Sequence, residues 1–195
     1  MNVWAQGQVY FVPTAVRHAD GTKQTCPGVQ GLPVQDSWNV PKLLPRVLAF
    51  RATLVADSPL IPKPAGKVIR TIAIRDDQTL EQLHEALRLA FGWDDPHLYC
   101  FWLSGKFWDR DSVRYSAPFE LEDDELSTRT PISEVGLGKG ARIAYLFDYG
   151  DEWRLLLEIA DDWPAGDESY PMLVEAEGTP PPQYQPLDED EDDDD

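Results

Sequence analysis

The sequence predicts an α+β fold in which one main helix packs on a mixed or antiparallel sheet and a β-hairpin lies toward the C-terminus. The predicted elements follow the order strand, strand, helix, strand, loop, strand, strand, which is not the βαβ alternation of nucleotide-binding folds. The 195-residue chain is 42% hydrophobic and contains seven Trp, seven Tyr and seven Phe residues. This composition is sufficient for the core of one domain.

The first two strands are predicted at residues 46–57 and 67–75. Both runs are rich in aliphatic and β-branched residues, which favour a half-buried strand. The connection between them contains Pro59, Pro62 and Pro64, and proline cannot donate to a strand ladder. Because this connection is short, we expect the two strands to pair as neighbours.

The main helix is predicted from Thr79 to Gly92. Thr79 and Gln82 form a capping box, in which each side chain accepts from a backbone amide of the first turn. Gly92 favours the left-handed conformation that ends a helix. A second, single helical turn is predicted over 130–136, with Thr130 as its N-cap. The apolar residues of the main helix form one stripe at helical spacing: Leu80, Leu83, Leu87, Ala90 and Phe91.

Residues 98–103 form a short, wholly apolar run, which predicts an interior strand. Residues 104–129 are polar and irregular, with an edge strand expected near Phe107 or Tyr115.

The hairpin is predicted from two alternating strands at 141–149 and 152–159. The alternation places Tyr149 on the same face as the buried aromatic residues of the first strand. Gly150-Asp151 is expected to supply the positive φ angles of a tight turn.

The chain is expected to comprise an irregular N-terminal arm (1–45), the α+β domain (46–185) and a disordered acidic tail (186–195). Every residue from 188 to 195 is acidic, and the whole chain carries a net charge of −18. Such a charge repels phosphate, so direct nucleic-acid binding and membrane binding are not expected. The N-terminus lacks the basic and apolar halves of a signal peptide, and a cytoplasmic location is expected.

The sequence contains no assembled set of catalytic residues. It has no phosphate-binding glycine loop after a strand and no serine-nucleophile elbow. Cys26 and Cys100 are far apart in sequence, which indicates neither a disulfide framework nor a zinc site. No cofactor is predicted, and the enzyme question stays open with a non-enzyme favoured.

One cluster of polar residues is a candidate site: His84, His97, Asp148 and Asp151. Histidine and carboxylate ligands together suit zinc, manganese or iron. However, no histidine pair has the spacing that places two ligands on one helical face. The favoured interpretation is structural, with hydrogen-bonded histidines and aspartates that stabilise the hairpin turn.

Several segments together resemble the Ri-plasmid ORF-three-like family, also called insertion-element passenger TnpR-like proteins. They are the run from Leu80-Glu81-Gln82-Leu83-His84 to Gly92-Trp93, the run His97-Leu98-Tyr99-Cys100-Phe101, the run Tyr145 to Trp153 (YLFDYGDEW), and the closing Tyr170-Pro171 and Pro180-Pro181-Pro182. The resemblance covers about residues 46–185 and implies a compact α+β fold with no established activity. This chain departs from it at Leu155, where similar proteins commonly carry histidine.

A non-catalytic protein-interaction module is the favoured function, with a protein partner. Trp93, Trp102 and Trp153, together with Trp108, are the candidate interaction aromatics, because exposed tryptophans commonly anchor interfaces. One alternative is an accessory protein of a mobile element or DNA transaction, which would bind a basic protein through the acidic tail. The other is a metal-dependent enzyme of unknown type that uses the polar cluster.

Overall fold

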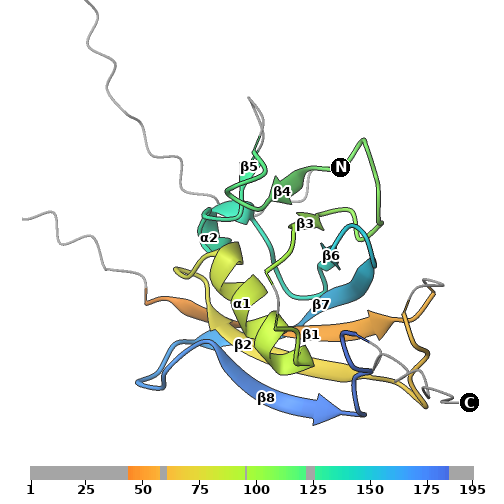
Figure 1. The fold of residues 1–195 in the computed structure, drawn as a ribbon. Helices are drawn as coiled ribbons and strands as arrows, with labels where there is room; N and C mark the ends of the chain where they lie inside the picture. Colours follow the sequence, from red (N-terminus) through yellow and green to blue (C-terminus); the bar gives the residue numbers. More distant parts are fainter. Residues whose placement is uncertain (1–43, 58–60, 95, 122–125, 185–195) are drawn as a thin grey trace, which may run out of the picture. The chain divides into compact units, whose positions relative to one another are not determined.

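The computed structural model describes residues 44–57, 61–94, 96–121 and 126–184 (Figure 1). The predicted acidic tail and nearly all of the predicted N-terminal arm lie outside these described residues. Among them, no helix is long and apolar enough to cross a membrane.

The α+β prediction is confirmed. Within the described part of the chain, one mixed sheet has the strand order β5-β4-β3-β6-β7-β1-β2-β8, and only β4 and β5 pair in parallel. Helix α1 lies across one face of this sheet (Figure 1). The elements are β1 (Arg46–Val55), β2 (Ile69–Arg75), α1 (Leu80–Phe91), β3 (Tyr99–Trp102), β4 (Arg114–Ser116), β5 (Leu126–Ser127), α2 (Ile132–Val135), β6 (Arg142–Phe147), β7 (Trp153–Pro164) and β8 (Met172–Glu177).

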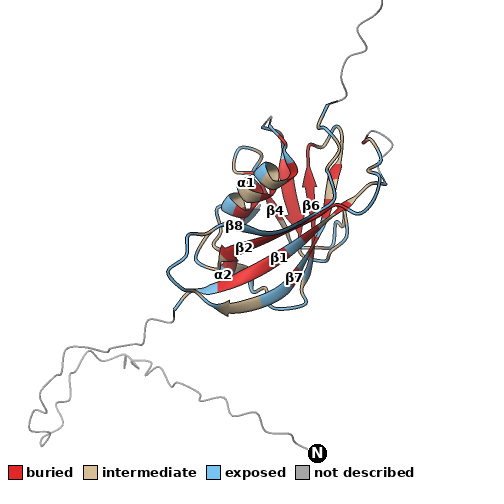
Figure 2. Ribbon diagram, turned by 90° about the horizontal axis from the view of Figure 1, so that it is seen from below, coloured by how far each residue is buried: buried red, intermediate tan, exposed pale blue. Residues whose placement is uncertain are grey.

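Strand β1 lies in the interior of the sheet, with β2 on one side and β7 on the other. The predicted pairing of the first two strands is confirmed, and its register runs from Val47 opposite Arg75 to Thr53 opposite Ile69. Buried positions run along β1, β2 and β6 (Figure 2).

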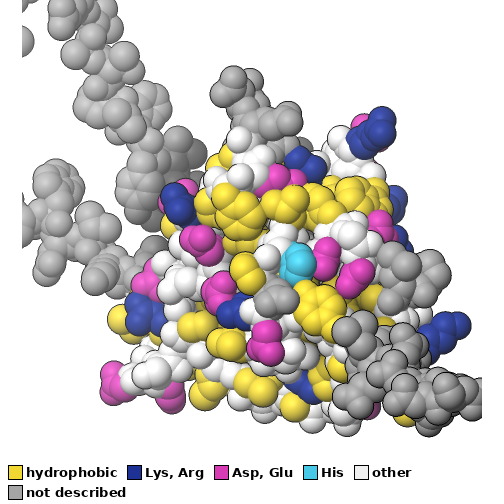
Figure 3. All heavy atoms as spheres, viewed as in Figure 1, with side chains coloured by type: hydrophobic (Ala, Val, Ile, Leu, Met, Phe, Trp, Pro, Cys, Tyr) yellow, Lys and Arg dark blue, Asp and Glu magenta, His cyan; other side chains and the backbone are white. Residues whose placement is uncertain are grey.

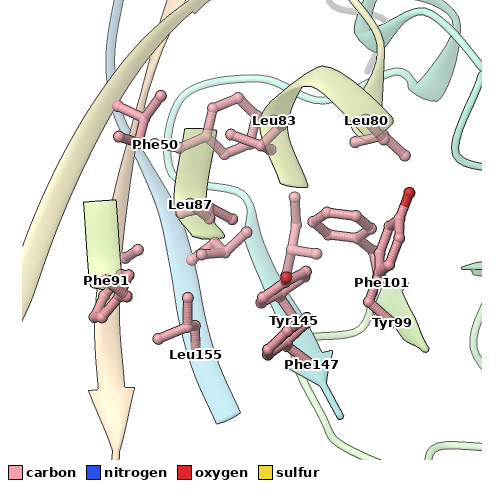
Figure 4. Close-up of a cluster of buried hydrophobic side chains, with 14 of the residues drawn as sticks. Phe50, Leu80, Leu83, Leu87, Phe91, Tyr99, Phe101, Tyr145, Phe147 and Leu155 are labelled. Atoms are coloured by element: carbon pink, nitrogen blue, oxygen red, sulfur yellow. The ribbon is translucent and has the colours of Figure 1, made fainter. Parts of the chain in front are cut away.

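Helix α1 has both of its predicted ends. Thr79 and Gln82 form the capping box, and Gly92 ends the helix at φ 74°. Leu83, Leu87 and Phe91 point from the helix into the core against the sheet (Figure 4). Each such buried side chain contributes about 1.5–3 kcal/mol. Packing therefore stabilises this 12-residue helix more than its intrinsic propensity does.

Alternating residues of the interior strands divide the buried side chains into two clusters. The larger cluster lies on the α1 face and includes Tyr99, Phe101 and Tyr145. The smaller cluster lies on the opposite face and consists of Cys100, Trp102, Ala144 and Leu146, with Phe107 and Tyr149 packed against it.

The hairpin of β6 and β7 is confirmed, but its turn differs from the prediction. The positive φ angles belong to Asp148 and Glu152, both at 58°, and not to Gly150 or Asp151. Asp148 can adopt this conformation because its Oδ1 accepts hydrogen bonds from the amides of Gly150 (2.9 Å) and Asp151 (3.4 Å). The left-handed residue interrupts the alternation, so Tyr149 packs in the smaller cluster instead of on the α1 face.

The start of α2 also differs from the prediction, since its N-cap is Pro131 and not Thr130. The carbonyl of Thr130 instead accepts a hydrogen bond from the amide of Leu80 at the start of α1 (3.2 Å). This contact joins the beginnings of the two helices.

Strand β8 was not predicted from the sequence. All six of its residues are exposed, so the run lacks the buried–exposed alternation that marks a strand. It pairs antiparallel with β2, with an irregularity between Thr71 and Ile72. The Arg70 guanidinium holds the C-terminal end of β8 by donating hydrogen bonds to the carbonyls of Glu177 (2.9 Å) and Gly178 (3.1 Å). The sheet therefore ends in an exposed edge strand.

Candidate functional site

The structure brings together part of the predicted polar cluster. His97 precedes β3 and Asp148 begins the hairpin turn, and the distance from His97 Nδ1 to Asp148 Oδ2 is 3.4 Å. The other ring nitrogen of His97 lies 2.9 Å from the Tyr184 hydroxyl. Asp151 contacts Asp148 through its backbone amide. These contacts join the hairpin turn to the segment before β3.

His84 occupies a separate, buried position on α1. Its ring stacks on Tyr99 with centroids 3.5 Å apart, and Nδ1 lies 2.8 Å from the Tyr145 hydroxyl. Burial, with a smaller contribution from the positive charge of Arg88, lowers the pKa of His84 from 6.5 to about 3. His84 is therefore neutral near pH 7, and so low a pKa makes it a poor general base there.

Both histidines line one small cavity of about 280 Å³, together with Glu81, Glu85 and Arg88. The Phe147 ring lies between them, with its centroid 5.9 Å from that of His84 and 5.6 Å from that of His97. Across the described residues, no group of three or more His, Cys, Asp or Glu side chains is arranged to hold a metal ion. The two histidines therefore lie in a hydrogen-bonded aromatic cluster.

Three of the four candidate tryptophans are buried, so the expectation of exposed anchors at these positions is wrong. Trp93 and Trp153 are each 1% exposed, and Trp102 is 3% exposed. Trp93 follows α1 and stacks against Phe147, with centroids 5.0 Å apart, at the centre of the larger cluster. Trp108 alone of the four presents its ring to solvent, with 46% of its surface exposed.

An apolar groove between α1 and β8 was not identified from the sequence. The cavity has a volume of about 650 Å³, and hydrophobic side chains are visible on this face (Figure 3). Leu89 is 70% exposed, because it lies outside the buried stripe of the helix. The apolar run Met172-Leu173-Val174 is the sequence signal that could have indicated the groove. Its lining residues are Ile72, Glu81, Gln82, Glu85, Ala86, Leu89, Ala90, Pro171, Met172 and Leu173.

The groove and the histidine cavity both lie within the part of the chain that matches a known protein family. The family model for plasmid pRiA4b ORF-3-like protein matches residues 61–184, which is more than half of the chain. The chain belongs to this family. The resemblance inferred from the sequence is therefore confirmed, and the pRiA4b ORF-3-like match extends from the segment before β2 to just beyond β8.

One curated relative of this pRiA4b ORF-3-like chain is the uncharacterised protein y4hQ of Sinorhizobium fredii (strain NBRC 101917 / NGR234). The two are 31% identical over 122 residues, which is 60% of this chain and 58% of y4hQ. The match thus spans less than two thirds of the relative's length.

A solved structure with a similar fold is the protein of unknown function MM3350 from Methanosarcina mazei Go1. The TM-score is 0.56, with 19% sequence identity, and the match covers 72% of this chain and 74% of that one. At this identity the similarity concerns the fold alone.

Proposed function

We propose that this pRiA4b ORF-3-like chain is a non-catalytic protein-interaction module that binds an extended, basic segment of a partner protein. The segment adds to the edge of β8 and places its apolar side chains in the groove between α1 and β8. The observation that carries the proposal is the combination of an exposed edge strand with an apolar groove beside it.

The edge of β8 provides the backbone part of this binding. β8 pairs with β2 on one side, and no described strand pairs with its other side. An edge strand presents N–H and C=O groups that can pair with an incoming strand. Peptide recognition by strand addition uses such hydrogen bonds for affinity and neighbouring pockets for specificity.

The groove provides the pocket. Leu89 and Ala86 from α1 form one wall, Met172 and Leu173 from β8 form the other, and Ile72 lies between them. A fully buried Leu or Val side chain of the partner would gain about 1.5–3 kcal/mol here. Two such residues would contribute about 3–6 kcal/mol, which offsets only part of the cost of association, so the backbone hydrogen bonds of strand addition must supply the rest.

The charges around the groove favour a basic partner over a second copy of this chain. Glu81 and Glu85 are the charged residues that line the groove, and both are acidic. Strand β8 carries the exposed residues Glu175 and Glu177. Pairing of two β8 edges would bring these glutamates together, and like charges across strands are destabilising. A partner segment that alternates Lys or Arg with aliphatic residues complements both the pocket and its charges.

A peptide-binding experiment with matched substitutions tests the proposal. Fluorescence anisotropy would be measured for labelled peptides of alternating basic and aliphatic residues, with acidic counterparts of the same apolar content. The full chain should bind the basic set preferentially, and Leu89→Lys should weaken binding about tenfold or more. Leu44→Lys is the control, because Leu44 is also 70% exposed but does not line the groove. Equal binding by wild type and Leu89→Lys, or no binding of any basic peptide, would refute the proposal.

Neither alternative predicted from the sequence is favoured by a specific observation. The acidic tail lies outside the described residues, so its binding to a basic protein stays a prediction. The histidine cavity likewise has no described set of ligands for a metal-dependent reaction.

A further inference from the structure

We infer that a second pocket, on the sheet face opposite α1, binds a small heteroaromatic anion of the nucleoside monophosphate class. This inference is independent of the proposed peptide groove. The pocket has a volume of about 570 Å³, which lies in the range of small-molecule sites. Its lining residues are Trp102, Trp108, Asp109, Arg110, Ser112 and Arg114.

The aromatic surface of the pocket comes from β3 and from the loop that follows it. The centroids of the Trp102 and Trp108 rings are 5.5 Å apart, with the ring planes inclined by 58°. Tyr149 supports Trp108 from another side, with centroids 5.7 Å apart. Trp102 is buried, whereas Trp108 is partly open to solvent. A planar base can therefore stack on the open part of the Trp108 ring.

The backbone at Trp108 is unusual for a residue of this size. Trp108 has a φ angle of 58°, a left-handed conformation that glycine adopts easily and a large residue rarely adopts. Residues held in such conformations occur preferentially at ligand sites. Glycine would satisfy the turn, but it could not present an indole to the pocket.

Two of the three charged residues that line the pocket, Arg110 and Arg114, are basic, and the third is Asp109. Arg114 lies directly opposite Trp102 in the β3–β4 pairing, so both side chains are on the same face of the sheet. Arg110 is exposed in the loop. An exposed guanidinium near an aromatic face suits a phosphate attached to a base, because guanidinium binds phosphate oxygens in pairs. Such a pocket stands out in a chain whose net charge is −18.

The other polar groups of the pocket hold the loop in place. Asp109 Oδ1 accepts a hydrogen bond from the Asp111 amide (3.1 Å). Ser112 Oγ accepts from the Ser104 amide (3.1 Å) and donates to the Val113 carbonyl (3.0 Å). These bonds fix the loop conformation, and Arg110 then supplies donors for the ligand.

Isothermal titration calorimetry on the full chain tests the inference, with AMP, GMP, CMP and UMP as probes. Adenosine and inorganic phosphate each carry only half of the recognised chemistry, and both should bind about tenfold or more weakly than AMP. A single-stranded oligonucleotide tests whether the site instead takes a polymer. The inference would be overturned if inorganic phosphate bound as tightly as AMP. It would also be overturned if the oligonucleotide bound and none of the mononucleotides did, or if all four nucleotides failed to bind at about millimolar concentration.

Substitutions locate the binding. Trp108→Gly suits the backbone but removes the ring, so it should weaken AMP binding about tenfold while the protein stays folded by circular dichroism. Arg110→Gln should weaken AMP binding without changing adenosine binding, and it decides the question if Trp108→Gly does not fold. Arg142→Gln is the matched control, because Arg142 is exposed and does not line this pocket. Unchanged AMP binding by Arg110→Gln and by a folded Trp108→Gly would place the ligand elsewhere and overturn the inference.

Discussion

Replacement of His84 by glutamine tests how far the buried histidine controls stability at acidic pH. The pKa of His84 is lowered from 6.5 to about 3 in the folded protein, chiefly by burial. The unfolded state therefore binds a proton that the folded state excludes, and stability falls as the pH decreases from about 6.5 toward 3. The stability that depends on neutral His84 is fully present above about pH 6.5. Between about pH 8 and pH 5, the free energy of unfolding should fall by about 2 kcal/mol because of His84.

The assay is urea unfolding at about pH 8 and about pH 5, followed by circular dichroism. At pH 8 the His84→Gln variant should be less stable than wild type by roughly 1–3 kcal/mol, because it loses the stacking on Tyr99 and part of the contact with Tyr145. At pH 5 this difference should shrink or reverse, because glutamine does not take up a proton. Acids that do not contact His84 have the same surroundings in both proteins and cancel in the comparison.

His97→Gln is the matched control for this experiment. The His97 side chain is 32% exposed, whereas that of His84 is 6% exposed, so His97→Gln removes an imidazole outside the buried core and leaves His84 in place. His97→Gln should keep the acid sensitivity of wild type. The reasoning is refuted if the difference between wild type and His84→Gln is the same at both pH values.

Three further substitutions test the contacts that hold α1 and β8. Thr79→Ala removes the capping box of α1 and should lower the free energy of unfolding by about 1 kcal/mol in urea titrations; an unchanged value would show that the cap adds nothing to the packing. Arg70→Met removes the donors to Glu177 and Gly178, so hydrogen exchange should accelerate in β8 before it does in β1; equal acceleration in both strands would contradict this local attachment. Gly178→Ala should lower the thermal midpoint more than Gly138→Ala does. A Cβ at residue 178 would lie 2.1 Å from the Lys67 carbonyl oxygen and the residue has a φ of 70°, whereas a Cβ at residue 138 would meet nothing within 4 Å. Equal effects of the two substitutions would contradict the close approach of Gly178 to Lys67.

Local signals were sufficient to predict α1, the first two strands and the hairpin. The capping box and the Gly92 terminus depend on atoms within a few residues, so the sequence displays them directly. The turn of the hairpin was predicted incorrectly because Asp148 and the pair Gly150-Asp151 are all residue types that commonly occur in turns. Which residue takes the positive φ depends on the Asp148 carboxylate bonding to two later amides.

Strand β8 and the tryptophan environments depend on distant parts of the chain. β8 is a strand because β2 and Arg70 hold it, and its own pattern does not show this. Trp93 is buried because it packs against Phe147 and Trp153 of the hairpin, which lie 54 and 60 residues later in the chain. Only part of the candidate polar cluster comes together, because these contacts also depend on distant parts of the chain. His97 reaches Asp148 across strand pairing, whereas the stack on Tyr99 and the contact with Tyr145 hold His84 within the core.

The two inferred sites lie on opposite faces of the same sheet. Ile72 of the groove belongs to the buried cluster on the α1 face, whereas Trp102 of the second pocket belongs to the cluster on the other face. Strands β6, β7, β1 and β2 separate β3 from β8 in the sheet. Neither site shares a lining residue with the other. Substitutions at distant positions without shared contacts usually have additive effects on stability, and the same independence is expected of the two pockets. The two proposed ligands, a partner segment on β8 and a small anion beside Trp108, would therefore be bound independently, because the strands between the two pockets give neither ligand a direct contact with the other's pocket.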